Sequence, residues 1–170
     1  MQIVNRTLKR AGGGAGVFFL AAALVASTAL AIVAPEQTRE AYVAQVEPIC
    51  KKNTKANERI LKDVRKKIQQ GKTKVAAGQF TQAAGAFRKA VVELRAVPQP
   101  AADSAKLTKW LKKLDAEAEL LQNIGKALKD DNKGQAQSYF AKLTSNGNLA
   151  NSTVLGFDFN YCLIDSSKFT

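Results

Sequence analysis

The stretch LTKWLKKLDAEAELLQNIGKAL, residues 107–128, carries the clearest pattern in this chain of 170 residues. Small and apolar residues recur along it at alternating steps of four and three, the spacing of a helix face that packs against other helices. The positions on this face are Leu107, Leu111, Leu114, Ala118, Leu121, Gly125 and Leu128. A neighbouring helix should approach closely at Gly125, which has no side chain. The pattern therefore predicts a helix of a bundle.

Further helices are expected on both sides of this stretch. A helix capped by Thr38 should carry apolar positions as far as Ile68 and stop at Gly71, with Pro48 kinking or splitting it. A second should cover about Thr73–Ala96 and end at the prolines of VPQP, residues 97–100. The helix that contains 107–128 should be capped by Asp103 or Ser104 and followed by a turn, KDDNKG at 129–134.

The last expected helix begins near Gln135 and runs to Leu143. The triplet Ser145-Asn146-Gly147 should break it, with helix resuming near Asn151. Short links between long helices favour antiparallel neighbours, and no stretch alternates as a strand would. We therefore expect an all-α fold, an antiparallel up-down bundle of about four helices, in a single domain over residues 35–170.

The first 34 residues have the layout of an export signal. Arg6, Lys9 and Arg10 precede 24 residues, 11–34, that carry no charge. Ala29-Leu30-Ala31 offers a cleavage pattern of small residues, whereas the length of the apolar run would also suit a membrane-spanning helix. Residues 1–34 are thus read as a signal peptide or an N-terminal membrane anchor. The protein should be exported across the cytoplasmic membrane and be either secreted or anchored.

The chain has two cysteines, Cys50 and Cys162, and cysteine pairs in exported proteins are usually oxidised. Only one pairing exists, and it would attach the segment GFDFNYC, residues 156–162, to the first helix. Phe157, Phe159 and Tyr161 are then expected to be apolar cover where this tail folds back. The sequence thus predicts a bundle closed by one disulfide.

Four motifs in this order resemble a large group of small exported or membrane-anchored bacterial helical envelope proteins. The motifs are YVAQVEPIC at 42–50, LRAVPQP at 94–100, KGQAQSYFAKL at 133–143, and the aromatic-glycine stretch that ends in Cys162. The group occurs mainly in high-GC Gram-positive lineages and has no known function. The resemblance implies an extracytoplasmic location and supplies no activity.

Nothing in the sequence points to catalysis. The chain has no histidine, which removes the usual general base and the commonest metal ligand. Asp115, Glu117 and Glu119 lie among lysines and are read as charges on a solvated helix face. We expect no enzyme activity, no catalytic residues, no cofactor and no metal site.

The net charge of +12 is concentrated in residues 51–74, where ten basic side chains face only Glu58 and Asp63. On a continuous helix, five of these would form one stripe about 20 Å long. The five are Lys51, Lys55, Arg59, Lys62 and Lys66. They are the candidate contacts for polyanions such as anionic lipid or wall polymer. No aromatic residue interrupts the run, so specific nucleic-acid binding has little support.

The expected function is that of an exported cell-envelope helical bundle, a binding or structural module with a basic surface. The alternative is a single-pass anchored accessory subunit, held in the membrane by an uncleaved N-terminal segment, whose helices dock another envelope protein.

Overall fold

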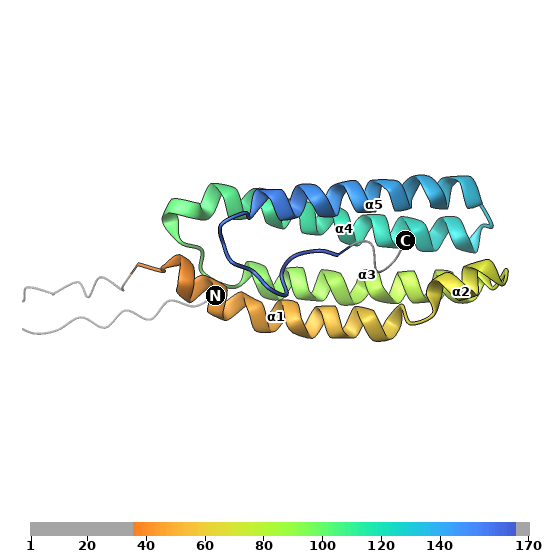
Figure 1. The fold of residues 1–170 in the computed structure, drawn as a ribbon, viewed down its shortest axis with the longest axis horizontal. Helices are drawn as coiled ribbons and strands as arrows, with labels where there is room; N and C mark the ends of the chain where they lie inside the picture. The colour runs from red at the N-terminus through yellow and green to blue at the C-terminus, as the bar shows by residue number, and fades with distance from the viewer. Residues whose placement is uncertain (1–35, 166–170) are drawn as a thin grey trace, which may run out of the picture. The chain divides into compact units, whose positions relative to one another are not determined.

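The computed structural model describes residues 36–165, and all regular structure in this range is helical. Four long helices make up most of it: α1 (Arg39–Ile60), α3 (Thr73–Arg95), α4 (Ser104–Lys129) and α5 (Lys133–Thr153). The short helix α2 (Val64–Gln69) and the 3-10 turn η1 (Ala101–Asp103) lie in the connections. Successive long helices run in opposite directions, so the described residues form an up-down bundle (Figure 1).

The N-terminal segment predicted as a signal peptide or anchor lies outside the described residues, as does its boundary with the bundle. Within residues 36–165, no helix combines the length and the apolar character needed to cross a membrane.

Helix α4 is central because it packs against both α3 and α5, while α1 packs against α3. Every position of its predicted apolar face is buried. At Gly125 an added methyl carbon would lie 2.8 Å from the Thr81 hydroxyl oxygen and 3.0 Å from the Ala77 carbonyl oxygen on α3. Real Cβ atoms are essentially never found this close to another atom, so the predicted close approach at this glycine is confirmed.

The first predicted helix, expected to reach Ile68, is longer than the observed α1, and of the two outcomes expected at Pro48 the split does not occur. Pro48 does not split α1, which continues through it from Arg39 to Ile60. Pro48 and Ala44 are both exposed, so water can bond the Ala44 carbonyl that the proline leaves without an N–H donor.

The chain instead leaves the helix at Leu61–Asp63, where Asp63 adopts the left-handed conformation with φ 58°. The side-chain amide of Gln79 on α3 donates to the carbonyls of Ile60 and Lys62 at this break. Carbonyls at a helix end need such partners, so a residue of another helix stabilises the interruption.

The predicted break at Ser145-Asn146-Gly147 is wrong, since α5 is continuous from Lys133 to Thr153. Both Asn146 and Gly147 are buried. The side-chain amide of Asn146 donates to the Lys113 carbonyl on α4 at 2.9 Å. Tertiary packing here overrides the low helix propensity of this triplet.

Asp103 occupies the N-cap position of α4, but its side chain makes no capping hydrogen bond. Its carboxylate instead accepts from the Arg39 guanidinium at 2.8 and 2.9 Å. Hydrogen bonding to Arg39 holds the pKa of Asp103 below its usual value. This pair joins the start of α1 to the start of α4, whereas Thr38 caps α1 as predicted by accepting from the Ala41 N–H.

Candidate functional site

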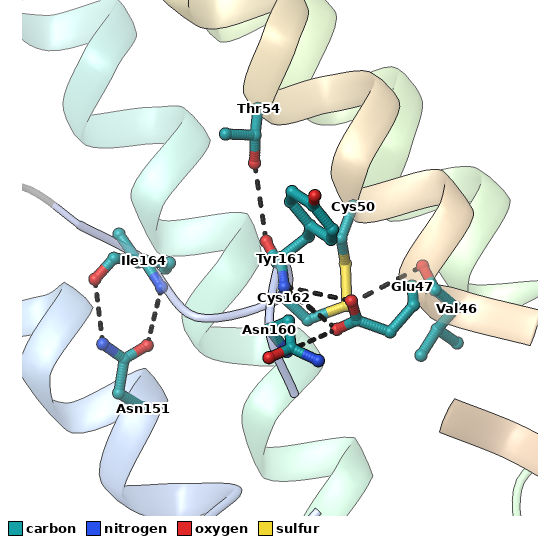
Figure 2. The surroundings of a disulfide bond; sticks show 9 residues. All are labelled: Val46, Glu47, Cys50, Thr54, Asn151, Asn160, Tyr161, Cys162 and Ile164. Carbon is teal, nitrogen blue, oxygen red and sulfur yellow. Dashed lines mark hydrogen bonds between the residues drawn. A yellow bond between two sulfur atoms is a disulfide. The ribbon is translucent and has the colours of Figure 1, made fainter. Parts of the chain in front are cut away.

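The C-terminal segment 156–165, which we name the strap, crosses the bundle between α5 and α1 (Figure 1). These two helices make little direct contact with each other. The predicted disulfide is present: Cys50 and Cys162 are joined, with their Cα atoms 5.0 Å apart. It attaches the strap to α1 (Figure 2).

Hydrogen bonds hold the strap on both sides (Figure 2). On α1, the carboxylate of Glu47 accepts from the backbone N–H groups of Asn160, Tyr161 and Cys162 at 2.9–3.3 Å. On α5, Asn151 donates to the Ile164 carbonyl and accepts from the Ile164 N–H, both at 2.8 Å. The strap therefore has a defined path between the two helices.

Two of the three aromatic residues of the strap are core residues, as predicted. Phe157 and Phe159 are buried and stacked, with Phe159 also against the ring of Trp110. The prediction is wrong for Tyr161, which is 41% exposed. The ammonium of Lys51 lies 4.8 Å from the centre of its ring.

Beneath the strap lies a cavity of about 410 Å³. It is bounded by α1, α3, α4 and strap residues 160–165. Much of its lining is apolar: Leu61, Phe87, Ala90, Val91, Leu94, Leu114, Leu121 and Ile164. Its size and lining fall within the range of small-molecule sites in proteins.

A buried polar layer divides the core at the level of this cavity. One apolar cluster contains Cys50, Leu114 and Ala150, and the other contains Leu61, Leu121 and Leu143. On each of three helices, a buried polar residue lies between a member of one cluster and a member of the other. These polar residues are Asn57 on α1, Glu117 on α4 and Asn146 on α5. Three helices thus place a polar side chain where the two apolar clusters meet.

Glu117 is the ionisable member of this layer and is only 2% exposed. The Asn146 amide donates to its Oε2 at 2.7 Å. Burial raises the pKa of Glu117 to about 7, and the hydrogen bond from Asn146 opposes that rise. The interpretation of Glu117 as a surface charge is therefore wrong, although Glu119 is exposed and Asp115 is half-exposed and pairs with Arg95.

The spacing of the polar layer contained a signal that sequence reasoning missed. Glu117 follows Leu114 by three residues and precedes Leu121 by four, the same rhythm as the apolar face. Asn146 stands in the same relation to Leu143 and Ala150. A polar residue at such a position is a candidate for burial whenever helices flank it on both sides.

Two buried polar atoms at the cavity have no hydrogen-bond partner among residues 36–165. They are the side-chain oxygen of Asn57 and the indole nitrogen of Trp110. Asn57 is 4% exposed and Trp110 is fully buried. Most buried polar groups in proteins are paired, so an unpaired acceptor and an unpaired donor beside one cavity call for an explanation.

The candidate polyanion contacts lie in the second half of α1, in the break that follows it and in α2. Lys51, Lys55 and Arg59 belong to α1, Lys62 to the break and Lys66 to α2; all five are exposed. The prediction of one stripe on a continuous helix is wrong because the chain changes course at residues 61–63. We name these five residues the basic face.

In the described part of the chain, no three His, Cys, Asp or Glu side chains gather as metal ligands. No protein-family model, no curated protein and no solved structure matches this chain.

Proposed function

We propose that this protein is an exported helical binding module of the cell envelope, and that the basic face contacts polyanions there. The observation that supports this proposal is the exposure of five basic side chains over one connected part of the chain, 51–66. A group of positive charges attracts polyanions over about a Debye length, and this attraction does not depend on the detailed chemical structure of the polyanion.

The disulfide supports an extracytoplasmic location, because such bonds persist in oxidising compartments and are rare in the cytosol. The proposed partners are anionic lipid headgroups or anionic wall polymer. The alternative of an anchored accessory subunit differs in the fate of residues 1–34. A mass for the mature protein that lacks about 30 residues excludes an anchor there, whereas the mass of the full chain supports one.

The test of the basic face is binding of the exported protein to vesicles with and without anionic lipid, and to anionic wall polymer. Binding should weaken steeply between low and physiological salt, since each contact displaces counterions. A variant with Lys55, Arg59, Lys62 and Lys66 changed to glutamine should lose most of this binding.

The matched control removes the same charge from another element. Lys109, Lys112, Lys126 and Lys129 are exposed on α4, and changing all four to glutamine should weaken binding much less. Equal loss in both variants would show that only net charge matters. Absence of binding at low salt would refute the proposal altogether.

A further inference from the structure

We propose that the cavity beneath the strap binds an uncharged, mainly apolar molecule that carries a hydroxyl or amide group. This site shares only Lys55 with the basic face, and its occupant differs in chemistry from a polyanion. The cavity volume, its apolar lining and its unpaired polar atoms lead to this assignment.

The lining first selects for an apolar body. Helix α3 contributes Phe87, Ala90, Val91 and Leu94 as a continuous apolar wall, and Leu114 and Leu121 of α4 face the same space. Transfer of apolar surface from water into such a space is favourable in proportion to the area removed from water. A small polar metabolite would gain nothing from these walls.

The unpaired atoms then select the polar group. The Asn57 oxygen can only accept a hydrogen bond, and the Trp110 indole N–H can only donate one. A hydroxyl or an amide supplies both a donor and an acceptor, so it can pair with either atom.

The position of the polar layer along the helix axes indicates where the polar group of the bound molecule would lie. Asn57 follows Cys50 by seven residues on α1, and Glu117 follows Trp110 by seven on α4. The two helices run in the same direction, so both polar residues lie about 10 Å further along the bundle than the disulfide and the indole. A polar group near Asn57 and Glu117 would leave the rest of the molecule to extend toward the strap.

The charges around the cavity select against an anion. Its acidic and basic lining groups are the carboxyl groups of Glu58, Glu117 and Asp165 and the ammonium of Lys55. Acidic groups therefore outnumber basic ones here, although the chain as a whole carries +12. An uncharged molecule avoids both this repulsion and the cost of desolvating a charge.

The test titrates the exported protein with 1-decanol and, as a probe with the same chain length and an anionic head, decanoate. Trp110 is the only tryptophan in the chain and lines the cavity, so its fluorescence reports occupancy directly. We expect saturable 1:1 binding of 1-decanol, at least tenfold tighter than that of decanoate at pH 7.5. Absence of saturable binding, or equal affinity for the two probes, would overturn the assignment.

Two variants locate the bound probe. Ala90→Leu adds apolar volume to the cavity wall and should weaken 1-decanol binding at least tenfold, whereas Ala141→Leu makes the same change on the exposed face of α5 and should have no effect. Asn57→Leu replaces the unpaired acceptor by an apolar side chain of the same branching and should weaken binding about tenfold. If circular dichroism shows that Ala90→Leu does not fold, the Asn57→Leu variant still tests whether the probe binds in the cavity.

If the folded cavity variants, Ala90→Leu and Asn57→Leu, bind 1-decanol as tightly as the unsubstituted protein does, the probe lies elsewhere and the inference is wrong. A variant with only Arg59, Lys62 and Lys66 of the basic face changed to glutamine leaves the cavity lining intact and should bind 1-decanol normally. Failure of the cavity assignment is thereby distinguished from failure of the proposed function.

Discussion

Replacing Glu117 by glutamine should remove most of the pH dependence of stability between pH 5 and pH 8. Burial raises the pKa of this carboxyl from 4.5 to about 7 in the folded protein. The folded state then binds the proton more tightly than the unfolded state does. The resulting stability is fully present below pH 4.5 and is lost as the pH rises through about 7.

The size of the effect follows from the two pKa values. One pKa unit corresponds to about 1.4 kcal/mol, so integration between pH 5 and pH 8 gives a loss of about 2–3 kcal/mol in the free energy of unfolding. Few other groups interfere, because the chain has no histidine. Asp103, whose pKa is lowered by Arg39, titrates below this range.

The assay is urea unfolding of the exported protein at pH 5, 6, 7 and 8, followed by the fluorescence of Trp110. Glutamine is neutral and can still accept the hydrogen bond from Asn146, so the Glu117→Gln variant should unfold at nearly the same urea concentration throughout. Glu119→Gln on the same helix is the control, because Glu119 is exposed and its replacement should leave the pH dependence unchanged. A Glu117→Gln variant that loses as much stability as the unsubstituted protein would refute the reasoning.

Three further outcomes are expected. Leu114→Ala should lower the free energy of unfolding by roughly 2–5 kcal/mol, because Leu114 is buried in the core; a change below about 0.5 kcal/mol in denaturant unfolding would contradict this. Gly125→Ala should cost about 1–3 kcal/mol through overpacking against α3, whereas Gly78→Ala, which meets open space, should be neutral or stabilising; thermal unfolding that ranks them the other way would count against the close approach. Thiol labelling of the unreduced protein should find no free cysteine, and reduction should lower stability by up to about 5 kcal/mol, the chain-entropy value for a loop of 112 residues; two reactive thiols before reduction would disprove the bond.

The periodic apolar face at 107–128 was sufficient to predict α4 and its burial, because apolar residues at this spacing lie on one side of a helix and are stabilised when that side packs against other helices. The end of α3 was predictable for a local reason, the prolines that follow it. The disulfide was predictable because the chain has only two cysteines, so Cys50 can pair only with Cys162. These features depend on residues near one another in sequence or on simple counting.

Other features depended on which helices meet. Whether Glu117 faces water or the core is undecided on an isolated helix, because it borders the apolar face. Its burial follows from α5 lying against α4 and bringing Asn146 to its carboxylate. The same contact keeps α5 helical through Asn146-Gly147, and the Gln79 side chain completes the break after α1.

The sequence by itself determined the helical class, the single disulfide and three helix boundaries: the cap at Thr38, the start at Thr73, and an end predicted at Ala96, one residue beyond the observed end at Arg95. The tertiary structure decided the course of the basic face, the polar layer and the cavity. The physical reason is that helical periodicity is a local property, whereas the environment of a side chain at the edge of a helix face is set by the neighbour that packs over it. Asn57, Glu117 and Asn146 are separated by up to 89 positions in the sequence, and only the bundle places them where its two apolar clusters meet.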